Sequence, residues 1–232
     1  MEGLLMEWEK RSLDHAEIRE SLRREIRSTR AFQLLRTLQW WARDWASPAP
    51  FHIKQSVLER YGSGIDVWIE SGTYRGDMTD VLSRLARRTI TIEPMPTLWA
   101  SAVRRFQKRD NIAVVNSASE NILEKIVSNC SGVVGFWLDG HWDGNEITFQ
   151  GNDDVPILAE LQAISATRHS LAGVRIFIDD VRLFTHANHK VRYPSLRELT
   201  QWAEGEGLIW WIEHDIFCAL SPDSFTSASV RS

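Results

Sequence analysis

The sequence predicts an α/β protein in which helices cover both faces of a mostly parallel sheet. Short apolar runs, of the kind that parallel sheets bury on both faces, alternate with segments whose apolar residues recur at three- and four-residue spacing. Before the first such run, the chain from Met6 to Trp45 has neither proline nor glycine. We therefore expect an N-terminal helical extension over residues 1–50 and one α/β domain over residues 51–232. A chain of 232 residues with 43% hydrophobic content can bury such a core.

The extension is expected to form two helices or one broken helix. Its apolar residues recur at roughly helical intervals: Leu13, Ile18, Leu22, Ile26 and Leu34. Three tryptophans then precede residues 47–51, SPAPF, whose prolines should stop the helix. The favoured interpretation is a helix that packs on the edge of the sheet. Because large aromatic side chains also anchor interfaces, a lid over the site or a homodimer contact through these helices is the alternative.

The first strand, loop and helix of the domain lie in residues 65–80, IDVWIESGTYRGDMTD. The apolar strand ends on Glu70, and Gly72 and Gly76 let the backbone turn closely around a ligand before a helix begins. A dinucleotide fingerprint has glycine where Glu70 stands, since a carboxylate repels a phosphate. The segment instead suits a cationic cofactor such as S-adenosylmethionine. The simpler alternative is that Glu70 only ends the strand and the glycines only serve the turn.

The remaining elements follow in order. Further strands are expected at residues 89–94, 111–115, 133–139 and 174–180, with a final pair within 207–220 joined at Glu213 to Asp215. Helices are expected at 52–62, 98–108, 121–127, 151–164 and 193–207. Val103 and Phe106 should face the sheet. Lys54 is expected at the surface, with contact to the cofactor carboxylate or the acceptor as the alternative.

Acidic residues end four of these strands. They are Glu70, Glu93, Asp139 and the pair Asp179 and Asp180. Glu93 lies about twenty residues after the first acid, where a nucleoside-binding fold needs a carboxylate for the ribose hydroxyls. Ligands of open α/β sheets bind beyond the carboxyl ends of the strands, so these acids are expected to meet at one crevice.

These motifs carry a resemblance to a known family. The order ESGTYRGD, TIEP, NSASEN, FWLDGHW, DVPILAEL, FIDDVRLF and YPSLREL resembles the class I S-adenosylmethionine-dependent methyltransferases over roughly residues 50–221. More narrowly, it resembles a bacterial branch that reads ETGTY, FWLDGH and IDDAR, and it is distantly similar to macrocin-type sugar O-methyltransferases. The resemblance implies a Rossmann-like fold with a seven-stranded sheet.

The resemblance also implies a set of cofactor-binding residues: Glu70, Gly72, Thr73, Tyr74, Gly76, Glu93, Ser117, Ser119 and Asp139. The chain departs from the family pattern at one place. The family usually has an aspartate beside a serine after the third strand, whereas this chain has Ala118 between two serines. Adenine would then be read by Ser119 or by the backbone.

The chemistry of methyl transfer suggests roles for the other acids. Asp139, Asp179 and Asp180 supply oxygen ligands at adjacent strand ends, which suit Mg²⁺. A bound metal would lower the pKa of an acceptor hydroxyl and hold it in line. His141 is the expected general base, with Asp143 as its substitute. The alternatives are a hydrogen-bonded loop histidine at position 141, and a helix cap or a partner for Arg182 at Asp180.

Composition narrows the class of protein. The net charge of −4 gives no basic footprint for nucleic acid, so the expected partner is a small-molecule acceptor. Two cysteines are too few for a disulfide framework. The sequence has no stretch long and apolar enough for a membrane span and no apolar leader, so we expect a cytoplasmic protein without a membrane partner.

The sequence therefore favours metal-assisted O-methylation of a small polyhydroxylated acceptor, a sugar or a secondary metabolite. Two alternatives stay open. One is a metal-independent N- or O-methyltransferase in which His141 works alone. The other is a domain that binds S-adenosylmethionine without turnover.

Overall fold

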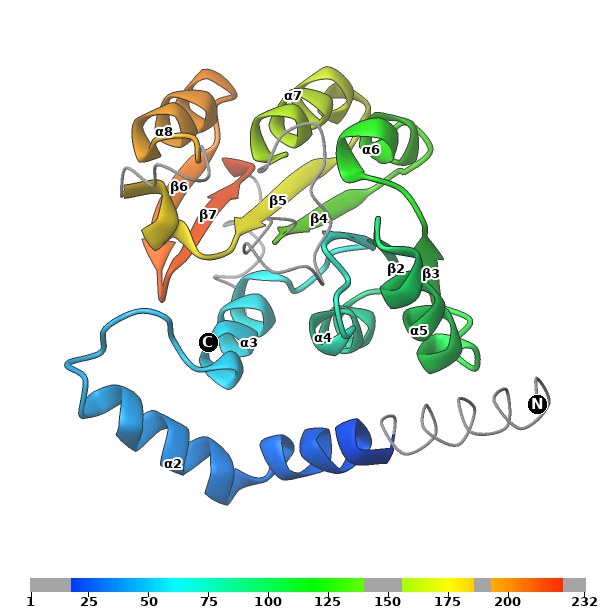
Figure 1. Ribbon diagram of the computed structural model, residues 1–232. Helices are drawn as coiled ribbons and strands as arrows, with labels where there is room; N and C mark the ends of the chain where they lie inside the picture. Colours follow the sequence, from blue (N-terminus) through cyan, green and yellow to red (C-terminus); the bar gives the residue numbers. More distant parts are fainter. Residues whose placement is uncertain (1–17, 140–155, 186–192, 223–232) are drawn as a thin grey trace. The chain divides into compact units, whose positions relative to one another are not determined.

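The computed structural model describes residues 18–139, 156–185 and 193–222 (Figure 1). The chain divides into two compact units, Met1–His52 and Ile53–Ser232. His141 and Asp143 lie outside the described residues. In the part of the chain that is described, no helix is both long and apolar enough to cross a membrane.

Between residues 18 and 41, the first unit contains two consecutive helices. Residues 18–28 are helical, and α2 (Arg30–Trp41) follows after a break at Thr29, whose hydroxyl accepts a hydrogen bond from the Phe32 amide. The prediction of two helices holds here. The prediction that the prolines stop the helix is wrong, because α2 ends at Trp41, before Asp44 and Trp45 adopt left-handed backbone angles of φ 53° and 59°.

The second unit is built on a seven-stranded sheet with the order β3-β2-β1-β4-β5-β7-β6. Its strands are β1 (Val67–Ser71), β2 (Arg88–Ile92), β3 (Ile112–Val115), β4 (Val133–Leu138), β5 (Gly173–Ile178), β6 (Ile209–Glu213) and β7 (Ile216–Leu220). β7 is antiparallel to both of its neighbours, and the pairs among β1 to β5 are parallel. The predicted mostly parallel seven-stranded sheet is confirmed.

One helix precedes the first strand and others connect the strands. They are α3 (Phe51–Tyr61), α4 (Asp77–Leu85), α5 (Pro96–Phe106), α6 (Ser119–Val127), α7 (Ile157–Thr167) and α8 (Leu196–Gly205), with short 3-10 turns η1 (Arg168–Ser170) and η2 (Val181–Thr185). Figure 1 shows α6, α7 and α8 on one side of the sheet and α3 and α4 on the other. The start of α8 is fixed by a capping box, in which Ser195 and Glu198 each bond the other's backbone amide.

Side chains along each strand point alternately to the two faces of the sheet, so the core has two layers. On one face, Phe136 and Ile176 pack with Leu123 of α6, Leu161 of α7 and Leu199 of α8. On the other face, three neighbouring strands contribute Trp68, Trp137 and Phe177, which pack with Val57 and Leu58 of α3 and Leu82 of α4. Because successive strand residues point to opposite faces and helices cover both, the central strands are mostly apolar, with Arg175 of β5 as a buried exception inside a strand.

One predicted orientation is wrong. Phe106 is buried as expected, but the side chain of Val103 is 39% exposed. α5 begins at Pro96 and buries Ala102 and Phe106, which are four residues apart on one face. Val103 follows Ala102 directly and so points about 100° away from that face.

Candidate functional site

The register of the sheet brings the strand-end acids to one level. Ser71 of β1 is paired with Ile92 of β2 and Leu138 of β4, and Leu138 is paired with Ile178 of β5. The residues that follow these partners are Glu93, Asp139 and Asp179, and Glu70 precedes Ser71. Four strands therefore present carboxylates at the same edge of the sheet, as the sequence predicts.

The turn between β1 and α4 lies at this edge of the sheet. Gly72, Tyr74 and Gly76 have positive φ angles of 87°, 47° and 78°. The amides of Gly72 and Thr73 both donate to the Ile92 carbonyl, and the Thr73 hydroxyl lies 2.5 Å from the hydroxyl of buried Thr91. A Cβ at Gly76 would come within 2.7 Å of the Phe106 ring, so this position has no room for a side chain.

Glu70 is buried at the base of this turn. The Thr79 hydroxyl donates to its Oε2 over 2.5 Å, while Oε1 has no hydrogen-bond partner of normal length among the described residues. Burial, and to a lesser degree the charge of Glu93, raises the pKa of Glu70 to about 7, against the opposing effect of the Thr79 and Thr91 hydroxyls. One oxygen of this carboxylate is therefore available to a hydrogen-bond donor.

Glu93 ties the turn to the end of β2. Its Oε2 accepts from the Tyr74 amide at 2.8 Å and its Oε1 accepts from the Met95 amide at 3.0 Å. Burial raises the pKa of Glu93, and these two bonds oppose the rise. A carboxylate oxygen has a second lone pair, so each oxygen can accept a further bond from a ligand hydroxyl.

The segment after β3 lies beside Glu93. The Asn116 side chain donates to the carbonyls of Glu93 at 2.8 Å and Pro94 at 3.1 Å. Ala118 caps α6 without a side-chain bond, and the half-buried Ser117 donates to the Ala118 carbonyl at 3.0 Å. Ser119 is the first residue of α6 and is buried.

A buried glutamate that the sequence analysis did not single out faces Ser119. Glu160 lies in the first turn of α7 and is fully buried, and neither of its carboxyl oxygens has a hydrogen-bond partner of normal length among the described residues. Burial raises the pKa of Glu160 to about 7, and the nearby hydroxyls of Ser119 and Ser71 oppose the rise. The residue lies in DVPILAEL, one of the motifs of the family resemblance, so its place in that motif was the available signal.

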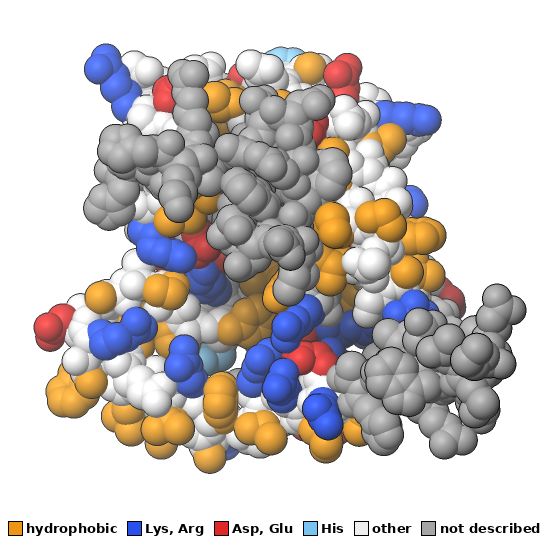
Figure 2. Space-filling view, viewed as in Figure 1, with side chains coloured by type: hydrophobic (Ala, Val, Ile, Leu, Met, Phe, Trp, Pro, Cys, Tyr) orange, Lys and Arg blue, Asp and Glu red, His pale blue; other side chains and the backbone are white. Residues whose placement is uncertain are grey.

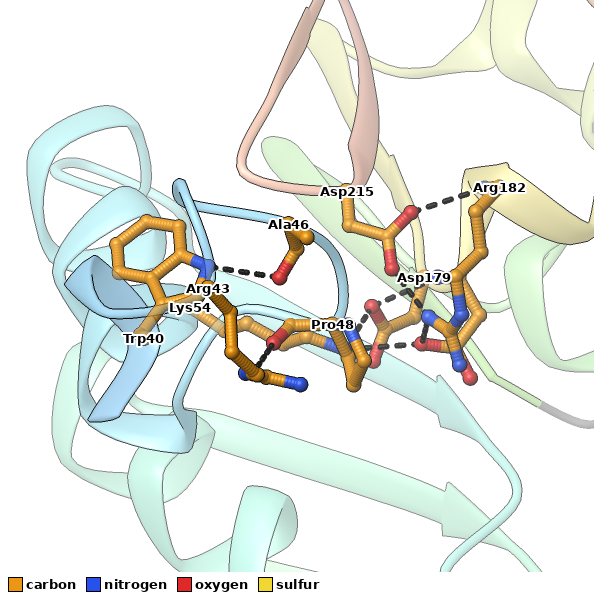
Figure 3. Close-up of polar contacts among 9 residues, drawn as sticks. Trp40, Arg43, Ala46, Pro48, Lys54, Asp179, Arg182 and Asp215 are labelled. Carbon is orange, nitrogen blue, oxygen red and sulfur yellow. Dashed lines mark hydrogen bonds and ion pairs between the residues drawn. The ribbon is translucent and has the colours of Figure 1, made fainter. Parts of the chain in front are cut away.

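Lys54 neutralises the acids at the end of β5. Its Nζ lies 2.5 Å from Asp179 Oδ1 and 3.0 Å from Asp180 Oδ1, and Figure 3 shows it reaching toward Asp179 from α3. The expectation that Lys54 lies at the surface is therefore wrong, since its side chain is only 10% exposed. It stands on the buried face of α3 with Val57 and Leu58, three and four residues further along the helix.

Arg182 and Asp215 complete this network (Figure 3). Arg182 Nη1 pairs with Asp180 Oδ1 at 2.6 Å and also with the Asp215 carboxylate, which accepts the Arg182 amide as well. The alternative in which Asp180 is a partner for Arg182 is thus the arrangement found. Asp215, in the turn between β6 and β7, was missed because a tight turn explains an aspartate there without any further role.

The charges of this cluster set its pKa values. Burial and then the charges of Asp179 and Asp180 raise the pKa of Asp139. Burial would also raise the pKa of Asp180, but Lys54 and Arg182 outweigh it and hold that pKa well below its usual range. Burial lowers the pKa of Lys54, but the charges of Asp179 and Asp180 together raise it by more. The amine therefore stays protonated.

These contacts do not favour the predicted metal set. Asp139, Asp179 and Asp180 do approach one another closely enough for their charges to interact. Among the described residues, however, no group of three or more His, Cys, Asp or Glu side chains has the arrangement of a metal site. The Lys54 ammonium is hydrogen-bonded to two of the three expected ligands.

No family model and no curated protein matches this chain in sequence. Solved structures match its fold. A protein from Clostridium thermocellum assigned as an rRNA methylase is 12% identical, with a TM-score of 0.50 over 72% of this chain and 93% of its own. A protein from Streptococcus mutans assigned as a methyltransferase, in complex with SAH, is 14% identical, with a TM-score of 0.47 over 75% of this chain and 98% of its own. The N-methyltransferase NodS from Bradyrhizobium japonicum, in complex with S-adenosyl-L-homocysteine, is 15% identical, with a TM-score of 0.46 over 81% and 99%.

The Clostridium likeness and the strand order together show that the chain has the fold of the class I S-adenosylmethionine-dependent methyltransferases. A likeness at this level of identity concerns the fold alone. The bacterial branch and the similarity to macrocin-type enzymes stay predictions from the sequence.

Proposed function

We propose that this protein binds S-adenosylmethionine and transfers its methyl group to a hydroxyl of a small polyhydroxylated acceptor, such as a sugar or a secondary metabolite. The observation that carries the proposal is the meeting of four strand-end acids beside a turn with three positive φ angles, on a methyltransferase fold. Ligands of such sheets bind at this edge.

The cofactor fits the charges at this edge. The buried Glu70 has an oxygen without a partner among the described residues, which suits the ammonium group of the cofactor. Glu93 suits the ribose hydroxyls, and the backbone and hydroxyls of Ser117 to Ser119 suit the adenine in place of the missing aspartate. A pyrophosphate would instead need hydrogen-bond donors where these carboxylates stand, so a nicotinamide dinucleotide fits poorly.

The reaction needs alignment and a base. A methyl group on a sulfonium is already activated, so the protein must hold the acceptor oxygen in line with it and take a proton. His141 is our candidate for the base and Asp143 its substitute, both from the segment that follows Asp139. Asp139 follows β4 and lies close enough to Lys54 and Asp179 for their charges to act on it.

The divalent metal expected from the sequence does not fit the described residues. Lys54 donates to Oδ1 of both Asp179 and Asp180, and Arg182 donates to the same oxygen of Asp180, so these two oxygens already face cationic groups. We therefore derive no step through a metal. The metal-independent reaction with His141 as base is the version that these contacts favour.

A small acceptor is preferred to a nucleic acid on grounds of charge. The chain has 27 basic and 31 acidic residues. Figure 2 shows Lys and Arg side chains on one face together with apolar and acidic ones, several of the basic ones close to one another. A protein that binds a phosphate backbone gathers its basic residues on one surface.

The test is incubation of the purified full chain with methyl-labelled S-adenosylmethionine and a metabolite extract, with and without chelator. Label in a small hydroxylated product supports the proposal, and label in added RNA would contradict the choice of acceptor. Binding of the cofactor with no transfer to any fraction would favour a non-catalytic domain.

A further inference from the structure

We infer that Lys54 is a built-in cation that takes the place of a divalent metal at the acceptor end of the site. The inference deepens the proposed function and rests on it for the acceptor, but its first test is metal binding, which needs no activity. Carboxylates from neighbouring strand ends repel one another when they are taken out of water, so a positive charge or a bound proton must neutralise them.

The geometry identifies which group supplies that charge. Lys54 Nζ lies within 3.0 Å of both Asp179 and Asp180, and the side chains of Lys54 and Asp179 are 10% and 7% exposed. Asp179 Oδ1 also accepts the Asp180 amide at 2.8 Å, so that oxygen has two donors. The ammonium thus stands where the oxygen ligands of a metal would have to converge.

Arg182 cannot serve the same purpose. Its guanidinium holds Asp180 and the buried carboxylate of Asp215 together, which ties the end of β5 to the turn between β6 and β7. Within the described residues, Asp179 is paired with Lys54, whereas Arg182 is paired with Asp180 and Asp215. Removing Lys54 would therefore leave Asp179 with no cation among the described residues.

The position of Lys54 follows from helix periodicity. Lys54, Val57 and Leu58 share the buried face of α3, and Val57 and Leu58 are fully buried against the sheet. The packing of these two residues sets the rotation of the helix, which points the lysine at the strand ends. The amine is held in place by the core and not by a flexible loop.

The Lys54 ammonium can donate a hydrogen bond to a ligand in addition to neutralising the two carboxylates. Lysine has three N–H donors, and the two carboxylates use two of them. The third can bind an acceptor hydroxyl oxygen beside Asp139. The chemical class that fits is a neutral polyol or sugar. A hydroxyl oxygen of such a molecule would accept a hydrogen bond from Lys54, and its O–H groups would donate hydrogen bonds to the neighbouring carboxylates.

The experiment compares Mn²⁺ binding to the full-length wild-type chain and to Lys54→Ala, by electron paramagnetic resonance and calorimetry. If the inference is right, the wild type binds Mn²⁺ weakly, and Lys54→Ala, in which Asp179 loses its cation and Asp180 keeps only Arg182, binds it on the order of tenfold more tightly or better. Adding Asp179→Asn to Lys54→Ala should abolish the gain. Equal Mn²⁺ affinity in the wild type and Lys54→Ala would overturn the inference.

A second variant guards against misfolding. Lys54→Gln keeps hydrogen-bond donors and removes the charge, and it should also gain Mn²⁺ binding together with a rise in Tm when Mn²⁺ is added. Lys54→Arg, which keeps the charge, should gain neither. If Lys54→Gln is folded and gains no Mn²⁺ affinity, Lys54 is only a structural ion pair and the inference fails.

Methyl transfer separates this inference from the proposed function. With an acceptor in hand, wild-type transfer should be unchanged in chelator, and Lys54→Ala should lose transfer and regain part of it with Mn²⁺. Loss of wild-type transfer in chelator would overturn the inference and leave the methyltransferase proposal standing. If no form transfers methyl groups, the proposed function fails, and the Mn²⁺ titrations still decide the role of the charge.

Discussion

The Thr79 hydroxyl donates a 2.5 Å hydrogen bond to Oε2 of Glu70, and so fixes a buried carboxylate with its other oxygen unpartnered among the described residues. This contact joins the first turn of α4 to the end of β1. It lets the site hold a carboxylate at a set angle before any ligand arrives, which reduces the cost of ordering on binding.

The first prediction concerns the pH dependence of cofactor binding. Because the pKa of Glu70 is raised to about 7, the free protein carries a protonated Glu70 below that pH and an ionised one above it. A ligand ammonium prefers the ionised form, so affinity for S-adenosylhomocysteine should rise between about pH 6 and pH 8. Calorimetry across this range measures it. Glu70→Gln should bind more weakly at pH 8 and lose the rise, and a rise that persists in Glu70→Gln would assign it to another group.

The second prediction concerns the glycine turn. Gly76 has a φ of 78°, and an added Cβ would lie 2.7 Å from Phe106. Gly76→Ala should lower the free energy of unfolding by about 1–3 kcal/mol, as strained backbone positions do, and should weaken cofactor binding. Gly205→Ala is the matched control, since nothing lies within 4 Å of its added Cβ. Denaturant unfolding of both variants is the measurement, and equal stability would contradict the strained turn.

The third prediction concerns Glu160 and stability. Its pKa is raised from 4.5 to about 7 in the folded chain, so between these values the folded chain keeps a proton that the unfolded chain has lost. The contribution of Glu160 to stability is therefore complete below about pH 4.5 and falls as the pH rises toward 7. The full shift corresponds to on the order of 3 kcal/mol. Glu160→Gln, which mimics the protonated form, should be more stable than the wild type at pH 8 and similar to it at pH 4.5.

Thermal unfolding of the wild type and Glu160→Gln at several pH values checks this. Glu124→Gln, at an exposed position on α6, is a suitable control and should leave the pH dependence unchanged. A wild-type advantage at pH 8 would mean that Glu160 is ionised and paired.

The fourth prediction concerns the base. His141→Ala should lower turnover by roughly a hundredfold or more, the usual share of general base catalysis, while affinity for S-adenosylhomocysteine stays close to that of the wild type. Single-turnover rates and calorimetry separate the two effects. Near-normal turnover in His141→Ala would move the role to Asp143, which Asp143→Ala then tests.

The sequence predicts the sheet and its strand ends well because these are local patterns. A buried parallel strand needs a continuous apolar run, and its first polar residue marks where it leaves the core, as Glu70, Glu93 and Asp139 do. The close turn between β1 and α4 was also predicted correctly from its glycines. Gly72 and Gly76 both have the positive φ angles that glycine tolerates.

The polar contacts between elements could not be predicted in the same way. A lysine on a short amphipathic helix is expected at the surface. Lys54 is buried because of the way α3 is rotated against the sheet, which the sequence does not specify. Asp179 and Lys54 are 125 residues apart in the chain, so their pairing depends on tertiary packing. Glu160 was missed for a different reason. An acid in the first turn of a helix is usually explained by the helix dipole, so its position did not suggest a further role.

Calorimetric titration of the full chain with S-adenosylhomocysteine and, separately, with NAD tests whether this edge of the sheet holds S-adenosylmethionine. We expect S-adenosylhomocysteine to bind at least about tenfold more tightly, a difference of about 1.4 kcal/mol, and Glu93→Ala to weaken its binding. Tighter binding of NAD, whose pyrophosphate would have to lie against Glu70 and Glu93, would show that this edge does not select S-adenosylmethionine.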